Sequence, residues 1–188
     1  MQKHIDLAKL SEVKGSLSAG DFCLLSGTLF TARDQAHIRL LNELKRSKTL
    51  PYGLEGACIF YAGPSPAKDG YVFGSVGPTT SARMDFAAPE LYRAGLIATI
   101  GKGVRSENIA EVCKEEQTLY FVAVGGAACE LANHVISSEL VAYEDLGPEA
   151  IRKIEVKDFP VFVAIDTSGN DLLRSVAAQA YERKEKLN

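Results

Sequence analysis

The sequence predicts an α/β fold in which strands and helices alternate along one chain. Short segments rich in β-branched and aromatic residues, bounded by turn formers, alternate with segments of helical periodicity. No linker, internal repeat or low-complexity segment interrupts this pattern. With 188 residues and 46% hydrophobic content, the chain is long enough to bury one sizeable core. We therefore expect a single domain over residues 1–188, in which residues 173–188 form a C-terminal helix with a charged tail.

Strands are expected wherever a short run is rich in β-branched or aromatic residues and ends at glycine, proline or a polar turn residue. Such runs cover residues 21–30, 56–63, 70–76, 96–101, 118–124, 139–145 and 160–166.

Helices are expected where apolar residues recur at intervals of three and four. These segments cover residues 31–47, 89–95, 106–116, 127–138 and 170–187. In the first, Thr31 stands three residues before Asp34, which predicts a variant of the capping box at the helix start. The second starts at a proline and stops at a glycine, as helix ends often do.

Charge and hydropathy limit the partners of the chain. A formal net charge of −3 and a pI near 5.7 give no global attraction to nucleic acid or to an anionic membrane, so any positive site must be local. The longest nearly apolar run is too short to span a bilayer, and the first residues lack the apolar core of a signal peptide. We expect a cytoplasmic protein that binds neither nucleic acid nor membrane.

The cysteines and histidines form no local metal motif. Cysteine occurs at positions 23, 58, 113 and 129, without a C-x-x-C pair, and histidine at positions 4, 37 and 134. We expect the thiols to be buried structural groups and expect no metal site built by this chain alone.

Cations stand at three predicted junctions between a strand and the following segment. Arg33 opens a helix in "SGTLFTARD", Arg83 lies in "GSVGPTTSARMD", and Lys102 stands between two glycines in "TIGKGVRS". Positive charge at a helix N-terminus opposes the macrodipole, and a bound anion would remove this conflict. The joint placement predicts a pocket for a carboxylate or phosphate.

Each of these features also has a purely structural interpretation. Arg33 alone is typical of a solvated surface residue, Lys102 of a turn lysine, and "GPTT" of a type I or II turn with a capping threonine. The pair Gly125 and Gly126 follows a predicted strand but lacks phosphate-loop spacing, so we expect close packing of helix on strand there.

Several motifs, taken in order, resemble a known family. The motifs "SGTLFTARDQAH", "YAGPSPAKDG", "GSVGPTTSARMD", "IGKG", "AVGGAA", "YEDLGPEAI" and "FPVFVAIDTSGND" are similar to the β subunit of class I, iron–sulfur-dependent fumarate hydratase. The β subunit of L-tartrate dehydratase is related to it. The resemblance extends from residue 5 to residue 172.

The resemblance implies a swivelling β/β/α three-layer domain with a mixed sheet. It also implies a hydro-lyase that converts fumarate to L-malate and is active only with an α subunit. That α subunit binds the [4Fe-4S] cluster, whose open iron acts as a Lewis acid, and αβ units pair as a homodimer. The alternatives are an L-tartrate dehydratase β subunit and a non-catalytic diacid-binding module; "YEDLGPEAI" and the aspartate of "SARMD" favour fumarate.

The resemblance further implies roles for individual residues. Substrate carboxylates are bound by cations that can stabilise the negative charge developing during hydration. These cations are Arg33, Arg83 and Lys102. Thr79 is implied as the catalytic residue in proton transfer, activated by a group of the α subunit. Neighbours that could orient these groups or the subunit contact are Asp34, His37 and Thr80.

Overall fold

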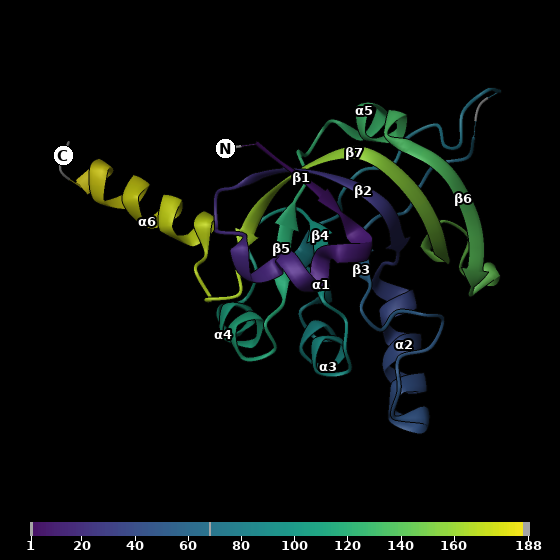
Figure 1. Ribbon diagram of the computed structural model, residues 1–188, viewed down its shortest axis with the longest axis horizontal. Coiled ribbons are helices and arrows are strands. Elements are labelled where there is room, and N and C mark those ends of the chain that lie inside the picture. The colour runs from purple at the N-terminus through teal and green to yellow at the C-terminus, as the bar shows by residue number, and fades with distance from the viewer. Residues whose placement is uncertain (1, 68, 186–188) are drawn as a thin grey trace.

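One mixed sheet of seven strands organises the chain (Figure 1). The structure, a computed structural model, describes residues 2–67 and 69–185. The strands are β1 (Gln2–Asp6), β2 (Phe22–Thr31), β3 (Cys58–Phe60), β4 (Ala98–Gly101), β5 (Leu119–Val122), β6 (Val135–Ala142) and β7 (Ile151–Ile165). The α-helices are α1 (Leu10–Val13), α2 (Asp34–Ser47), α3 (Ala88–Arg93), α4 (Glu107–Glu115), α5 (Ala128–Asn133) and α6 (Leu172–Glu185). The short 3₁₀ helices are η1 (Leu7–Lys9), η2 (Lys14–Ser16), η3 (Ser81–Met84) and η4 (Glu144–Glu149).

The sheet combines parallel and antiparallel pairing. Strands β1 to β5 run parallel to one another, whereas β7 runs antiparallel to β2, β5 and β6. β7 pairs with β2 from Phe162 opposite Phe22 to Arg152 opposite Thr31. Because β7 also pairs with β5, the strands β2, β3, β4, β5 and β7 close into a ring, with β1 attached to β2 and β6 to β7. The expected α/β fold with a mixed sheet is confirmed.

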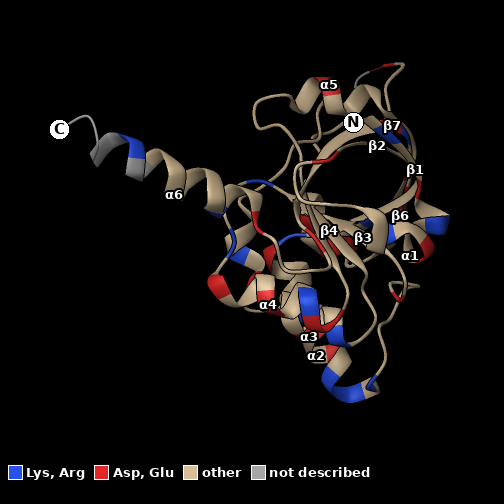
Figure 2. Ribbon diagram, turned by 60° about the vertical axis from the view of Figure 1, so that its left-hand side comes forward, with Lys and Arg blue, Asp and Glu red and all other residues tan. Residues whose placement is uncertain are grey.

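The sheet separates two buried apolar clusters, because successive side chains of a strand point to opposite faces. In β3, Cys58 and Phe60 join the cluster that includes α5, while Ile59 joins the cluster that includes α2, α3 and α4. Figure 1 shows these three helices together on one side of the sheet and α5 on the other. Figure 2 shows acidic and basic residues interleaved along the three helices. The arrangement is compatible with the expected three-layer domain.

The predicted capping box at the start of α2 is wrong. Thr31 still belongs to β2, where it pairs with Phe60 of β3, and the N-cap is Arg33, which makes no side-chain cap. Asp34 is the first helical residue. Pairing of Thr31 in the sheet therefore overrides the local capping pattern.

The predicted strand over residues 70–76 is also wrong, because this segment is irregular. The Gly74 N–H donates to the carbonyl of Pro66 at 3.0 Å, and the Val76 N–H donates to the carbonyl of Ala128 at 2.9 Å. Val76 is nevertheless fully buried. The apolar pattern here reflects loop side chains that enter the core without pairing in the sheet.

Other boundaries differ from prediction near the β6–β7 hairpin. The helix expected over 127–138 ends at Asn133, and the strand expected over 139–145 is displaced to Val135–Ala142. Neither β1 nor residues 151–159 of β7 was predicted as strand. The segment "IRKIEVKD" alternates charged and apolar residues. It pairs with the adjacent strand β6 and with β2, which is distant in sequence.

The C-terminal helix α6 is fastened at its first turn and extends away from the sheet (Figure 1). The Arg174 guanidinium donates to the Arg105 carbonyl at 2.9 Å and to a Glu107 carboxylate oxygen at 3.1 Å. Residues 186–188 of the expected tail lie outside the described residues. Within the described ranges, no helix is long and apolar enough to cross a membrane.

Candidate carboxylate-binding site

The residues predicted to bind or transform substrate all follow the carboxyl ends of neighbouring parallel strands. Arg33 comes shortly after β2, Thr79 and Arg83 lie in the segment between β3 and β4, and Lys102 comes directly after β4. Because β2, β3 and β4 are adjacent and parallel, their carboxyl ends lie at one edge of the sheet. The three cation-bearing junctions identified in the sequence therefore meet at this edge.

Backbone hydrogen bonds fix Thr79 next to Lys102. The Thr79 N–H donates to the Tyr61 carbonyl at 2.7 Å, and the Lys102 N–H donates to the Thr79 carbonyl at 3.2 Å. The Ser81 N–H then donates to the Lys102 carbonyl at 2.9 Å, and Thr80 forms a parallel bridge with Lys102. The "PTTS" segment thus extends the sheet between the ends of β3 and β4, with Thr79 half-buried and Thr80 exposed.

Gly101 permits this close approach of two segments. A Cβ atom at Gly101 would collide with Ser81 Oγ and would lie 3.1 Å from a ring carbon of Tyr61. The first glycine of "IGKG" is therefore required by packing of the threonine segment against β4.

The two arginines share one acidic neighbour. Nε of Arg83 lies 2.9 Å from Oδ1 of Asp34, and Nε of Arg33 lies 3.8 Å from Oδ2 of the same carboxylate. Glu149 adds a further contact, with its Oε1 3.8 Å from a terminal nitrogen of Arg33. In the sequence, Glu149 was noted only as part of the motif "YEDLGPEAI". The structure shows that it lies near Arg33 as a counter-ion.

Gly63 makes room for the Arg33 side chain. A Cβ atom at Gly63 would lie 3.0 Å from Cδ of Arg33 and 2.9 Å from the carbonyl oxygen of Pro148. The guanidinium consequently lies between the loop after β3 and η4, partly shielded from solvent, with 26% of the side chain exposed.

Lys102 is exposed, as is Arg83, but within the described part of the chain it lacks an acidic partner. Among the described residues, its ammonium makes neither a hydrogen bond nor an ion pair. The predicted packing of helix on strand at Gly125 is wrong, since the atom that a Cβ there would meet is Cδ of Lys102, at 3.7 Å. Gly126 has a φ of 87°, a conformation that favours glycine. The glycine pair thus forms a turn beside the stem of Lys102.

His37 supports the backbone at Arg33. It is fully buried in α2, and its Nδ1 donates to the Arg33 carbonyl at 2.7 Å. Its ring packs edge-on against Tyr61 with the centroids 5.1 Å apart. Burial lowers the pKa of His37 to about 4, so the imidazole is neutral at physiological pH. The hydrogen bond of His37 is thus made to the main chain of Arg33 and not to its guanidinium.

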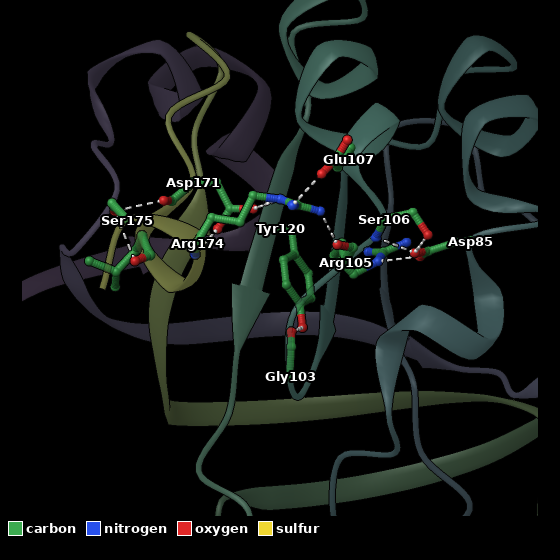
Figure 3. A network of polar contacts seen from close by, with 10 residues as sticks. Asp85, Gly103, Arg105, Ser106, Glu107, Tyr120, Asp171, Arg174 and Ser175 are labelled. Atoms are coloured by element: carbon green, nitrogen blue, oxygen red, sulfur yellow. Dashed lines mark hydrogen bonds and ion pairs between the residues drawn. The ribbon is translucent and has the colours of Figure 1, made fainter. Parts of the chain in front are cut away.

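Sequence reasoning did not identify a buried ion pair behind the site. The side chain of Arg105 is fully buried, and its Nε donates to Oδ1 of Asp85 at 2.5 Å. Asp85 also accepts hydrogen bonds from the backbone N–H and the hydroxyl of Ser106, as Figure 3 shows. The aspartate of "SARMD" therefore fixes its loop, and the lone arginine in "GVRS" carried no signal that it would be buried.

The cation site is open to solvent and is separate from the main cavity. This cavity, of about 720 Å³, lies between η1 and β2 on one side and residues 52–58 on the other. None of Arg33, Thr79, Arg83 and Lys102 lines it. A ligand held by these residues would need a further surface to enclose it.

The thiols do not fit an iron–sulfur cluster. Cys23, Cys58 and Cys113 are buried, as expected, whereas Cys129 is exposed, so the expectation of burial is wrong for that residue. Burial raises the pKa of Cys23 and of Cys113 to about 11, which disfavours the thiolate that binds iron. In the part of the chain that is described, no three His, Cys, Asp or Glu side chains converge to hold a metal ion.

Comparison with known proteins identifies similar chains. The family model described as Fumarase C-terminus matches residues 1–176. The aerobic class I fumarate hydratase of Escherichia coli K12 is 40% identical over 154 residues, which cover 81% of this chain and 28% of that enzyme. The chain thus spans less than a third of the length of this relative.

Two other relatives match over nearly their whole length. The L(+)-tartrate dehydratase subunit beta of Escherichia coli K12 is 37% identical over 190 residues, covering 98% of this chain and 93% of that subunit. A putative L(+)-tartrate dehydratase subunit beta of Methanocaldococcus jannaschii is 37% identical over 177 residues, covering 91% of each chain.

Proposed function

The chain belongs to the Fumarase C-terminus family, and on that premise we propose that it is the β subunit of a hydro-lyase acting on a four-carbon dicarboxylate. The observation that carries the proposal is the meeting of Arg33, Arg83 and Lys102 beside Thr79 at one edge of the sheet. Two guanidiniums and one ammonium around a hydroxyl suit a small dianion better than a monoanion.

The chemistry of hydration explains these residue types. Adding water to fumarate places negative charge on the carbon and carboxylate next to the reacting centre. Fixed cations stabilise that charge, and the arginines can bind a carboxylate in a bidentate manner. Thr79, fixed beside Lys102 by the backbone, is proposed to move the proton at this carbon.

A partner subunit is proposed to complete the site. The cations lie outside the main cavity, and the cysteines do not fit a cluster, so the iron–sulfur cluster is assigned to an α subunit. The loops of the site also carry exposed large apolar residues: Phe86, Val104 and Val124. Exposed apolar residues of this size around a polar centre are typical of a surface that another chain covers. We propose that αβ units then pair as a homodimer.

Fumarate and L-malate are the proposed substrate pair, because the relative of highest identity given above, at 40%, is a fumarate hydratase. The second candidate is tartrate, which would lose water to give oxaloacetate. The observation that favours it is that the tartrate dehydratase β subunits match over more than nine-tenths of their length, as separate chains.

The experiment is anaerobic co-expression with a candidate cysteine-bearing α chain, followed by assays on L-malate, fumarate and both tartrate enantiomers. Malate dehydration by the complex, and by neither chain alone, is the expected result. Tartrate dehydration without malate dehydration would transfer the assignment to the second candidate. A stable complex that binds these diacids without converting any of them would indicate a non-catalytic module.

A further inference from the structure

Two loops carry the site, and one buried hydroxyl contacts both. The first loop holds Thr79 and Arg83, and the second begins at Lys102. The hydroxyl of Tyr120 on β5 lies 2.9 Å from Oγ of Ser81 in the first loop and 2.8 Å from the carbonyl oxygen of Gly103 in the second. Figure 3 shows the Tyr120 side chain extending from its strand to Gly103.

The Tyr120 hydroxyl is suited to keep its hydrogen bonds with Ser81 and Gly103 at physiological pH. It is fully buried, and this burial raises the pKa of its phenol, which therefore stays protonated and able to hydrogen-bond at physiological pH. Ser81 is also fully buried. In such surroundings an unpaired hydroxyl or carbonyl is costly, so the three groups favour a single arrangement.

The same loops are joined a second time through Arg105. This residue belongs to the second loop and pairs with Asp85, which ends the first. Its guanidinium also lies over the Tyr120 ring, 4.8 Å from the centroid. The first loop is thus fastened on both sides of Arg83, at Ser81 by Tyr120 and at Asp85 by Arg105.

We propose that Tyr120 is a positioning residue, whose hydroxyl holds the Thr79–Arg83 loop in register with the Lys102 loop. The expected effect on the reaction rate rests on the proposed function. The joining of the two loops rests on the hydrogen bonds alone. Tyr120 contacts no proposed substrate group, so it acts through Thr79, Arg83 and Lys102. Misplacement of such groups by about 1 Å can lower a rate by roughly 10²-fold.

Tyr92 provides a matched control. It is also a buried tyrosine, and its hydroxyl hydrogen-bonds Oγ1 of Thr99 at 2.6 Å. Tyr92→Phe therefore removes a buried hydroxyl of the same kind but leaves Ser81 and Gly103 joined. Thr99 still has the Arg105 guanidinium as a partner, at 3.3 Å.

The test compares Tyr120→Phe with Tyr92→Phe by two measurements. The first is amide hydrogen exchange of the full chain. We expect faster exchange in residues 79–85 and 102–106 for Tyr120→Phe and wild-type exchange there for Tyr92→Phe. The second is steady-state kinetics of the αβ complex, where we expect kcat/KM to fall roughly 10- to 100-fold for Tyr120→Phe, against less than threefold for Tyr92→Phe, on the basis of misplacement.

The two measurements separate the inference from the proposed function. Faster exchange in both loops, combined with a wild-type complex that lacks hydro-lyase activity, would remove the proposed function and leave the joining of the loops standing. Unchanged exchange in both loops would overturn the inference. Equal losses of kcat/KM and of thermal stability in the two variants would show that Tyr120 acts only as a buried core residue. That result would also overturn the inference.

Discussion

Asp34 forms an ion pair with Arg83, with its Oδ1 2.9 Å from Nε of the arginine. The two residues come from different segments: Asp34 is the first residue of α2, and Arg83 lies in η3. Because the other carboxylate oxygen faces Arg33 at 3.8 Å, one acid orients both arginines of the proposed site. The cations are thus held apart at a fixed spacing before any substrate binds.

Replacing Asp34 tests this orientation. Asp34→Asn keeps the size of the side chain but removes its charge, so Arg83 loses its ion-pair partner. We expect kcat/KM of the αβ complex to fall roughly tenfold, equivalent to about 1.4 kcal/mol, mainly through a higher KM. The control is Asp145→Asn, which breaks the exposed ion pair with Arg39 at the surface. Equal kinetics of both variants would show that Asp34 does not orient the site.

Arg83 itself is expected to need its planar guanidinium. Arg83→Lys keeps the positive charge but cannot form a bidentate pair with a carboxylate. We expect kcat/KM to fall by the equivalent of about 2–4 kcal/mol, with little change in thermal stability. Arg93→Lys is the control, because Arg93 has the same exposure, 48% against 49%, and lies in α3 with Glu90 as its partner. Wild-type kinetics for Arg83→Lys would identify Arg83 as a turn residue.

His37 predicts a specific dependence of stability on pH. Its pKa is lowered from 6.5 to about 4 in the folded chain, so between these values the unfolded chain binds a proton that the folded chain does not. The contribution of neutral His37 to the free energy of unfolding is therefore fully present above pH 6.5 and is lost as pH falls toward 4. The total loss is about 3 kcal/mol.

The measurement for His37 is urea unfolding at several pH values between 7.5 and 4.5, for wild type and His37→Asn. Asparagine can keep the hydrogen bond to the Arg33 carbonyl but does not titrate in this range. We expect the wild type to lose more free energy of unfolding than the variant as pH falls. Parallel curves for the two proteins would mean that His37 does not titrate in this way.

The cysteines predict the colour and the thiol reactivity of the purified chain. Cys129 is exposed and the other three thiols are buried, so a thiol reagent should modify one cysteine in the folded chain and all four after unfolding. The chain alone should be colourless and inactive. A brown protein with iron–sulfur absorbance would contradict the assignment of the cluster to a partner. Rapid reaction of all thiols in the folded chain would contradict the burial of Cys23, Cys58 and Cys113.

Local sequence signals predicted those parts of the fold that local interactions determine. The strands around residues 58–60 and 98–101 and the helix over 34–47 follow from composition and periodicity. The capping box failed because Thr31 pairs with a distant strand, and residues 151–159 were missed because they pair with β2, which is remote in sequence. Such pairings are set by the tertiary fold.

The same distinction holds for the site. Arg33 and Lys102 could be named from the sequence because each follows a predicted strand that the structure contains, and carboxyl ends of parallel strands meet at one edge. Arg83 was named after a predicted strand over residues 70–76, which is irregular in the structure. The contacts that orient them could not be named. The Asp34–Arg83 pair, the Asp85–Arg105 pair and the Tyr120 hydroxyl each join segments that approach only in the folded chain.

The most direct test of the central claim, that this chain supplies the reacting group as well as the cations, is Thr79→Ala in the assembled αβ complex. The experiment measures kcat for malate dehydration, exchange of the malate methylene proton with solvent deuterium, and thermal stability. Thr49→Ala is the control, because Thr49 is exposed. We predict that kcat and exchange fall roughly 10²- to 10⁴-fold, as for a lost acid–base group, while KM and stability stay near wild type because the cations still bind the substrate. Normal kcat and normal exchange in a Thr79→Ala complex would contradict the claim and transfer the proton step to the partner chain.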